Sequence, residues 1–387
     1  MDTQKLDQTY IANTYARFPV TIVKGKGSLV WDDTGKEYID LSTGIAVDIF
    51  GVADEEWMAA VTKQLGTLQH ISNLYYTEPC VKLAQMLCEK TGMKKVFFGN
   101  SGAEANECAI KAARKWSEEK KGKDYSTIIT LKNSFHGRTI TTLAATGQDV
   151  FHHDFTPLTE GFVYVEPNDL ADLEQLIKAN KCAAVMMEVV QGEGGVMPLD
   201  EAYVKGAAKL CEQYDLLLIC DEVQVGNGRS GKLYGYMHYG VQPDIVSTAK
   251  GLAGGLPLGA TLLGEKVQDV LSAGTHGSTF GGNPVCCAGA INVLSRLDEK
   301  MLEGVEERSA YIKQELAGAK GVLGVSGLGL MLGIQTEKNA SDIIAACREK
   351  GVLAIKAKDK LRLLPALNIP MEQLQKAVAV IKACCAE

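Results

Sequence analysis

Apolar runs alternate with amphipathic stretches between about residues 80 and 265 of the chain. The stretch 200–214 illustrates the amphipathic kind, with Asp200 as a candidate cap at its start. Its apolar positions follow the helical spacing i, i+3, i+4 and i+7: Val204, Ala207, Ala208 and Cys211. This alternation predicts βα units and a mostly parallel sheet.

Seven apolar runs are expected to be the strands of that sheet: 96–99, 127–131, 162–165, 183–190, 216–220, 245–248 and 259–264. They are apolar at nearly every position, which is typical of strands covered on both faces. The sequence therefore predicts an α/β fold in which helices flank a mostly parallel seven-stranded sheet.

The two ends of the chain have a different character. The stretch 27–44 reads as a hairpin with its turn at 33–35, and from about residue 290 a long charged helix precedes shorter helical and strand-like runs. We expect a large domain over 51–285, a smaller α+β domain over 286–387, and an N-terminal segment, 1–50, that packs with the smaller domain.

Composition limits the partners. The 387 residues carry a net charge of −7 and no dense run of Lys or Arg, which argues against nucleic acid. The N-terminus lacks the apolar core of a signal peptide and no run of 18 apolar residues occurs, so we expect a cytoplasmic protein without a membrane partner.

The eleven cysteines are odd in number and no Cys-x-x-Cys motif occurs, which favours reduced core thiols. The six histidines form no recognisable metal-binding set, so we expect no metal, and small metabolites are the expected partners.

Lys250 lies between an apolar run and a glycine-rich stretch, at the expected end of a strand. Burying an ammonium group is costly, so a lysine in this place is expected to have a lowered pKa. Such an amine is suited to reacting as a nucleophile. A surface lysine that begins a glycine-rich turn is an equally good interpretation of this stretch alone.

Asp221 directly follows another buried strand, where open α/β sheets bind ligands. Glu222 comes next, and two successive side chains point to opposite faces, so one acid can face a site while the other is structural. A helix cap or an ion-paired acid is the alternative interpretation of Asp221.

The stretch 96–116 reads as a strand, a Gly/Ser/Asn turn and an Ala-rich helix, which would aim free N–H groups at an anion such as phosphate. Ser101 and Glu104 also have the spacing of a capping box, which needs no ligand.

A competing motif, G-x-G-x-x-G, occurs at Gly226, Gly228 and Gly231 and would suggest a nicotinamide-dependent dehydrogenase. The residues that follow it are aromatic and glycine-punctuated, a poor start for the helix that must bind a pyrophosphate. An ordinary loop is the preferred interpretation.

A lysine, an acid at a strand end and a phosphate cup together describe a pyridoxal phosphate site. The sequence also resembles the class III, ornithine-type aminotransferases of fold type I, most closely the acetylornithine-type members. The matching segments follow the family order: NTYARFPV, SNLYYTEP, NSGAEANECAIKAAR, FHGRT, QGEGGV, DEVQVGNGRSG, AKGLAGGLPLGA, HGSTFGGNP and LRLLPALNI.

The resemblance implies roles for the residues around the cofactor. Lys250 would bind the cofactor aldehyde covalently and later move the substrate proton, while Asp221 would pair with the ring nitrogen. Gln224 would bond the ring hydroxyl, and Val223 and Phe135 would sandwich the ring. The phosphate would be held by three residues of one subunit and one of its dimer partner: Ser101, Gly102, Ala103 and, from the partner, Thr279.

The resemblance also implies a substrate site. Arg138 and Arg362 would bind the two carboxylates of glutamate, and Glu193 would pair with Arg362 when the substrate leaves it free. Tyr15 and Ser278 are further candidates for lining this site, and Tyr15 is equally well explained by packing.

The family's activity is thus expected here: transfer of the terminal amino group of N-acetylornithine to 2-oxoglutarate by a homodimer with shared sites. Succinylornithine, ornithine, acyl-lysine and 4-aminobutyrate are alternative donors. The stretch 50–57 lacks the usual Gly-His-x-His-Pro, which puts local loop shape and substrate preference in question. Gly44 and Ile45 occupy the stretch where ornithine enzymes carry a tyrosine, which disfavours free ornithine.

Overall fold

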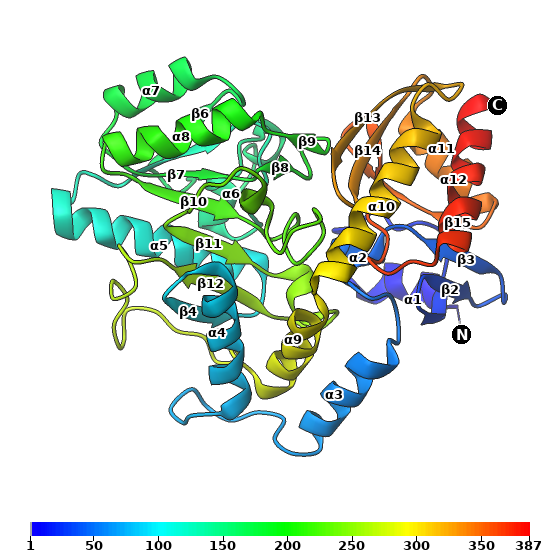
Figure 1. The fold of residues 1–387 in the computed structure, drawn as a ribbon, viewed down its shortest axis with the longest axis horizontal. Helices are drawn as coiled ribbons and strands as arrows, with labels where there is room; N and C mark the ends of the chain where they lie inside the picture. The colour runs from blue at the N-terminus through cyan, green and yellow to red at the C-terminus, as the bar shows by residue number, and fades with distance from the viewer. Residues whose placement is uncertain (1) are drawn as a thin grey trace.

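A seven-stranded sheet forms the centre of the larger part of the molecule (Figure 1). The structure is a computed structural model and describes residues 2–387. The strands are β4 (Lys95–Gly99), β5 (Thr127–Leu131), β6 (Phe162–Val165), β7 (Cys182–Met187), β10 (Leu217–Asp221), β11 (Ile245–Thr248) and β12 (Gly259–Leu263). Their order is β4-β12-β11-β10-β7-β5-β6, and β12 alone among these seven runs against its neighbours. The predicted mostly parallel α/β sheet is confirmed.

One strand prediction is wrong in its length. The run 183–190 was expected to be a single strand, but β7 ends at Met187. Val190 instead pairs with Pro198 in a small ribbon of β8 (Val190–Gln191) and β9 (Met197–Pro198). Glu188 interrupts the apolar run and follows the last residue of β7. Its buried carboxylate accepts hydrogen bonds from the backbone of two loops.

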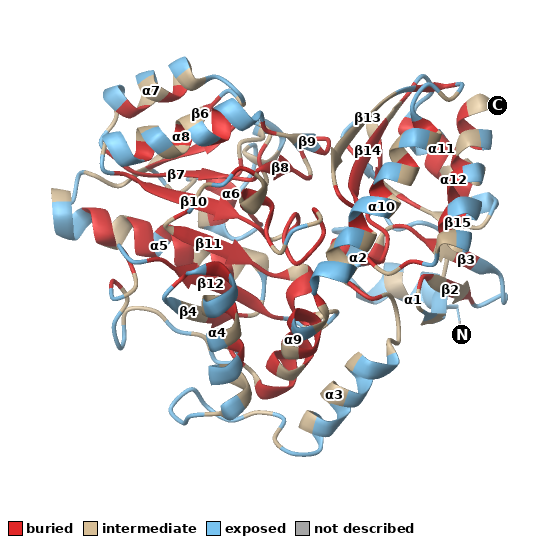
Figure 2. Cartoon of the chain, in the orientation of Figure 1, coloured by how far each residue is buried: buried red, intermediate tan, exposed pale blue. Residues whose placement is uncertain are grey.

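Helices cover both faces of the sheet, as alternate side chains along each strand require. Ala184 and Met186 of β7 belong to one core cluster together with the helix α5 (Gly102–Lys121). Val185 and Met187 belong to the other cluster together with α8 (Glu201–Gln213). Figure 2 shows this buried centre between partly exposed helices. The remaining helices of this part of the chain are α4 (Glu78–Thr91), α6 (Ile140–Ala145), α7 (Leu170–Ala179), α9 (Pro284–Arg296) and α3 (Glu55–Leu65), the last of which packs against α9.

The cap predicted for α8 is present only in position. Asp200 is the N-cap residue, but its side chain makes no capping hydrogen bond. The apolar face of the helix is buried as expected, since Val204, Ala207 and Cys211 are all inaccessible to solvent.

The C-terminal part is a separate layer of sheet and helices. Its strands are β13 (Val322–Leu328), β14 (Met331–Thr336), β16 (Ile355–Ala357) and β17 (Lys360–Leu363), in the order β13-β14-β17-β16. Its helices are α10 (Glu299–Leu316), α11 (Ala340–Glu349) and α12 (Met371–Ala386).

The N-terminal segment joins this C-terminal part through a shared sheet. It contains α1 (Thr3–Tyr10), β1 (Ile22–Lys26), β2 (Leu29–Asp32), β3 (Glu37–Asp40) and α2 (Thr43–Ala46). β2 and β3 form the expected hairpin, and β3 also pairs with β15 (Val352–Leu353) in parallel. The exact domain boundaries at 50/51 and 285/286 stay predictions.

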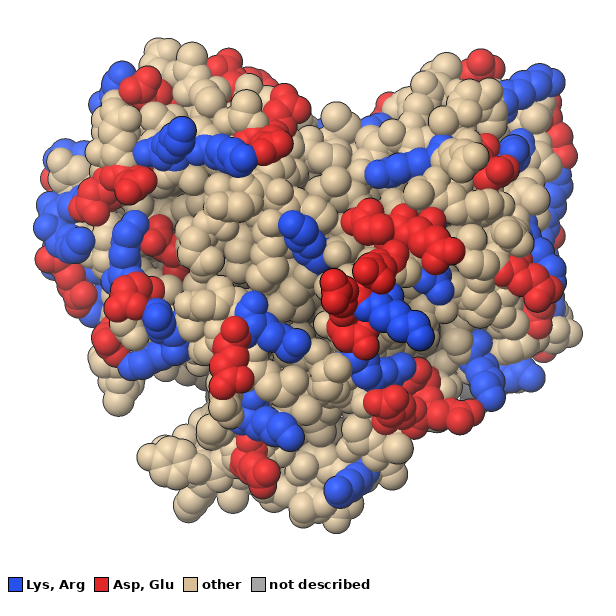
Figure 3. Space-filling view, viewed as in Figure 1, with Lys and Arg blue, Asp and Glu red and all other residues tan. Residues whose placement is uncertain are grey.

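All eleven cysteines are free thiols, and most are buried. Positive and negative side chains are interspersed on the face shown in Figure 3. Within residues 2–387, none of the helices is long and apolar enough to cross a bilayer, and the acidic, cysteine and histidine side chains form no group suited to a metal ion.

Candidate active site

Lys250 follows β11 and opens the 3₁₀ turn η3 (Lys250–Ala253) in the left-handed region, with φ of 46°. Desolvation of the ammonium group lowers its pKa to about 8, although Glu193 and Asp221 lie close enough to oppose this shift. A larger fraction of the amine is therefore neutral, and so nucleophilic, than in an exposed lysine.

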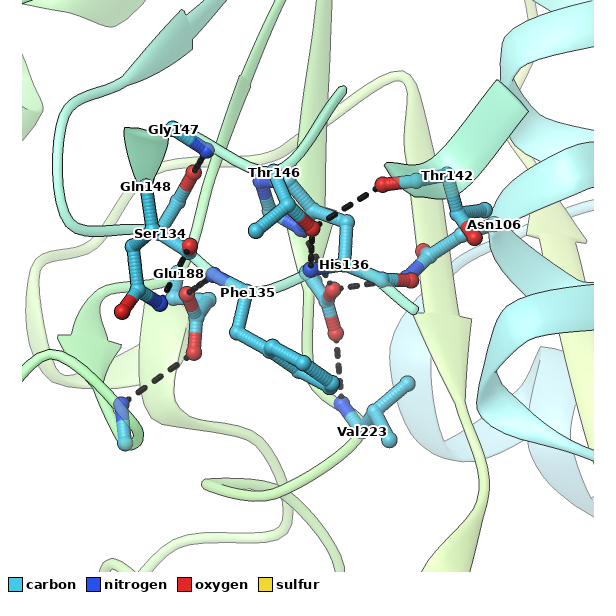
Figure 4. A network of polar contacts seen from close by, with 12 residues as sticks. Asn106, Ser134, Phe135, His136, Thr142, Thr146, Gly147, Gln148, Glu188 and Val223 are labelled. Atoms are coloured by element: carbon cyan, nitrogen blue, oxygen red, sulfur yellow. Dashed lines mark hydrogen bonds and ion pairs between the residues drawn. The ribbon is translucent and has the colours of Figure 1, made fainter. Parts of the chain in front are cut away.

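Asp221 ends β10, and both of its carboxylate oxygens have hydrogen-bond partners. Figure 4 shows these partners: Asn106, His136 and Val223. The Asp221 Oδ2 accepts a hydrogen bond from Asn106 Nδ2 at 2.8 Å and lies 2.7 Å from Nδ1 of His136, while its Oδ1 accepts from the N–H of Val223 at 3.0 Å. Burial alone would lower the pKa of His136, but the bond to Asp221 outweighs it and raises the pKa. These three contacts thus hold the carboxylate in one orientation, in which its negative charge can pair with a cation.

Glu222 points away from this network and has a structural task. Its two oxygens accept the N–H groups of Gly235 and Tyr236 at 2.7 and 2.8 Å. Burial raises the pKa of Glu222 to about 8, and Asp221 adds to the shift. The two successive acids therefore separate, as the strand alternation predicts.

The start of α5 lies beside the loop that follows Asp221. A Cβ built on Gly102 would come within 2.6 Å of the Val223 side chain, so only glycine permits this approach. Ser101 caps the helix by accepting the Glu104 N–H, and the Glu104 carboxylate accepts the Ser101 hydroxyl in return at 3.0 Å. The N–H groups of Gly102 and Ala103 have no acceptor within the helix, because the first turn of a helix leaves its donors free. Only the Ser101 half of the predicted capping box forms, because the Glu104 carboxylate accepts the Ser101 hydroxyl and the Asn100 N–H instead of the Ser101 N–H. This cap leaves the first helical N–H groups open to an anion.

Phe135 precedes His136 in the loop after β5, and its ring meets Phe151 edge to face, with centroids 5.9 Å apart. Arg138 is exposed and its guanidinium lies over both rings, 5.3 Å from the Phe135 centroid and 4.2 Å from that of Phe151. Arg138 is therefore an accessible cation next to Phe135.

Arg362, on β17, reaches the same region from the C-terminal part. It is only 2% exposed, and its Nη1 donates to Glu193 at 2.6 Å and to Gln224 at 3.0 Å. Gln224 also donates to Glu193 at 3.4 Å. Burial would raise the pKa of Glu193, but Arg362 outweighs it and holds that pKa below its ordinary value. Glu193 thus neutralises the buried Arg362 guanidinium from a position that is itself partly exposed to solvent.

Three predicted residues are less closely tied to this cluster. Ser278 accepts a hydrogen bond from Asn100 beside the anion cup, at 3.1 Å. Thr279 is exposed, as a residue serving a partner subunit would be, and that role stays a prediction. Tyr15 is 70% exposed and stacks under Arg17, so the described contacts do not bring it to Lys250.

The unusual stretch 50–57 packs against the Lys250 turn. Trp57 Nε1 donates to the carbonyl of Ala253 in η3 at 3.0 Å. Asp54 pairs with Arg296 through both Nη atoms of the guanidinium, at 2.5 and 3.0 Å. This stretch is therefore built into the fold beside the candidate site.

The competing glycine motif does not form a nucleotide-binding turn. A Cβ on Gly231 would lie 1.9 Å from the Glu306 carboxylate, and one on Gly228 would meet Leu297 at 2.8 Å. Turns and the short η2 (Gly235–His238) follow the motif instead of a helix start. The loop packs against the C-terminal part, which overturns the dehydrogenase alternative.

Sequence reasoning missed three buried residues of the network: Asn106, His136 and Glu188. Two signals were available. His136 lies next to the predicted Phe135, and Glu188 is a single acid inside an apolar run. Asn106 lies in the helix predicted to bind phosphate, but nothing local indicates that its amide reaches an aspartate 115 positions away.

These residues fit pyridoxal phosphate. A desolvated amine, a fixed carboxylate and a helix start with free N–H groups match an aldehyde, a pyridinium nitrogen and a phosphate, respectively. The geometry defines a fold type I site for such a cofactor, so the class of enzyme follows from the fold and the site together.

Comparison with known proteins leads to the same class of enzyme. The profile of the family described as aminotransferase class-III matches residues 10–385. An acetylornithine aminotransferase of Haemophilus ducreyi is 50% identical over 99% of this chain and 98% of its own, and one of Methanocaldococcus jannaschii is 43% identical over 96% and 95%.

Solved structures share this fold over nearly the whole chain. The crystal structure of ornithine aminotransferase from Toxoplasma gondii ME49 has a TM-score of 0.95 at 33% identity, covering 99% of this chain and 94% of its own. N-acetylornithine aminotransferase from Stenotrophomonas maltophilia has a TM-score of 0.86 at 36% identity, covering 99% and 98%. The chain belongs to the class III aminotransferase family and is a pyridoxal-phosphate-dependent aminotransferase.

Proposed function

We propose that this enzyme transfers the terminal amino group of N-acetylornithine to 2-oxoglutarate, forming N-acetylglutamate 5-semialdehyde and glutamate, as a step of arginine biosynthesis. The observation that carries the proposal is the ion pair of buried Arg362 with half-buried Glu193, which gives one site two charge states. The acetylornithine aminotransferases of 40–50% identity support the choice of donor.

The chemistry divides between cofactor and chain. Bound pyridoxal phosphate supplies the electron sink that accepts charge from the amine-bearing carbon. Lys250 would move the proton from that carbon to the cofactor and, in the second half-reaction, from the cofactor to the α-carbon of the forming glutamate, a task that suits an amine of lowered pKa. Asp221, oriented by Asn106 and His136, would pair with the ring nitrogen and keep it protonated.

The two substrates are told apart by charge. The two carboxylates of 2-oxoglutarate or glutamate would engage Arg138 and Arg362, with the second displacing Glu193. N-acetylornithine has a single carboxylate, on the same carbon as its acylamide, and its amine-bearing terminal carbon carries none, so its carboxylate would engage Arg138 while Glu193 would keep Arg362 neutralised. Without that pairing, a buried guanidinium would face the substrate uncompensated.

We further propose a homodimer with shared sites, in which Thr279 binds the phosphate of the neighbouring subunit. Large apolar side chains are exposed on the loop 71–76 and beside Thr279, including Tyr76 at 100% and Phe280 at 59%. Surfaces of this kind are typical of protein interfaces. A cytoplasmic location is part of the proposal, and the eleven free thiols support it.

The test is a donor panel at fixed 2-oxoglutarate: N-acetylornithine, N-succinylornithine, ornithine, acyl-lysine and 4-aminobutyrate. We expect the highest kcat/KM for N-acetylornithine. A clear preference for free ornithine or 4-aminobutyrate would overturn the donor, because both lack the acylamide group that N-acetylornithine carries beside its carboxylate.

A further inference from the structure

Glu188 is a buried acid of the site for which the proposed reaction has no use. It follows β7 directly, and because Met187 pairs with Cys220, it emerges beside Asp221 at the same sheet edge. The residue is 6% exposed, and burial raises its pKa to about 7, with the nearby Asp221 adding to the shift. A carboxyl group in this place destabilises the fold unless its contacts compensate.

The contacts of Glu188 join two loops. Its Oε1 accepts the N–H of Phe135 at 2.8 Å (Figure 4), and its Oε2 accepts the N–H of Gly192 at 3.2 Å. Phe135 carries the ring next to Arg138, and Gly192 directly precedes Glu193. One carboxylate thus bridges the loop facing the cofactor and the loop facing the substrate.

The second loop has little freedom apart from this bond. A Cβ on Gly192 would lie 2.5 Å from the Gln224 amide oxygen, so the backbone passes directly against the side chain that also bonds Arg362. A shift of the Gly192 N–H therefore moves Glu193 relative to Arg362.

We propose that Glu188 is a positioning residue, whose carboxylate fixes the Phe135 ring over the cofactor and the Glu193 carboxylate against Arg362. It acts through these neighbours and touches neither substrate nor cofactor. The inference rests on the proposed roles of Phe135 and Glu193.

The matched control is Glu222, because it is the same residue type, is also buried, and also accepts two backbone N–H groups, but away from the site. Glu188→Gln keeps the size of the side chain but turns an NH₂ toward one of the two N–H donors. Glu222→Gln makes the same change directly after β10, where the two donors are Gly235 and Tyr236.

The first measurement uses the cofactor-free protein and no substrate. Amide hydrogen exchange is followed in peptides covering 133–137 and 190–194. In Glu188→Gln we expect exchange about tenfold faster in both peptides, from the loss of one hydrogen bond to a charged group. In Glu222→Gln we expect both peptides to be unchanged.

The second measurement is functional. Titration of the cofactor-free protein with pyridoxal phosphate should show about tenfold weaker binding in Glu188→Gln. In the reconstituted enzyme, KM for N-acetylornithine should rise several-fold relative to KM for 2-oxoglutarate, because only the former needs Glu193 in place. Glu222→Gln should change neither the affinity for pyridoxal phosphate nor the ratio of the two KM values.

Glu188→Asp is the second variant, since it keeps the charge but withdraws the oxygens by one methylene, and it should behave as Glu188→Gln does. Unchanged exchange in both peptides would overturn the proposal. So would equal effects of the two Gln variants, or failure of both Glu188 variants to fold, because these outcomes assign the carboxylate to the core alone. If exchange changes while no donor is turned over, the proposed function fails and the positioning role stands.

Discussion

Glu193 provides the most informative perturbation of the site because it competes with a substrate carboxylate for Arg362. The Glu193→Ala variant removes the 2.6 Å bond and leaves Arg362 bonded to Gln224. A dicarboxylate then no longer has to displace an internal partner, while N-acetylornithine meets an uncompensated guanidinium.

The size of the effect follows from the burial of the pair. Hydrogen bonds to charged groups contribute about 1.5–3 kcal/mol. Arg362 is almost fully buried, but the Glu193 side chain is 30% exposed and partly screened, so we take roughly 1–2 kcal/mol. This corresponds to a change of about 5- to 30-fold in the ratio of the two specificity constants.

The assay is steady-state kinetics of both half-reactions. In Glu193→Ala, kcat/KM for 2-oxoglutarate should rise, or stay constant, while kcat/KM for N-acetylornithine falls. Glu193→Gln is the control, because its amide oxygen still accepts from Arg362 and should give a smaller change. An equal fall for both substrates would refute the switch and leave Glu193 a purely structural partner.

Three further outcomes are expected. Lys250→Ala should bind pyridoxal phosphate without a bond that borohydride can fix, and kcat should fall roughly 100- to 10,000-fold; normal transamination by this variant would remove Lys250 from the mechanism. Asn106→Ala deprives Asp221 of one of its bonds and should weaken cofactor binding about tenfold in a titration of the cofactor-free protein; unchanged affinity would contradict the orienting role. Glu222 keeps its proton up to about pH 8 in the folded state but only to about pH 4.5 when unfolded, so its contribution to the free energy of unfolding falls as pH rises between these values. Glu222→Gln should abolish that part of the pH dependence in urea unfolding, and identical pH profiles of variant and parent would refute the assignment.

Local patterns in the sequence are enough to predict much of the sheet. An apolar run such as 216–220 predicts a strand because a chain covered on both faces must be apolar on both. The divergence of Asp221 and Glu222 also follows locally, from the alternation of side chains along β10. Where the pattern breaks, at Glu188, the prediction fails, since periodicity does not indicate what a buried acid will bond.

Contacts between distant segments were decided by the tertiary structure alone. Asp221 meets His136 across 85 positions, and Arg362 meets Glu193 across 169. Neither separation carries a periodic signal, because the strand order places these loops at one sheet edge only after the whole chain has folded. The sequence by itself thus determined which chemical groups this protein has and which elements carry them. Their distances, and with them the lowered pKa of Lys250 and the pairing of Arg362, arise from the burial and close approach that packing imposes.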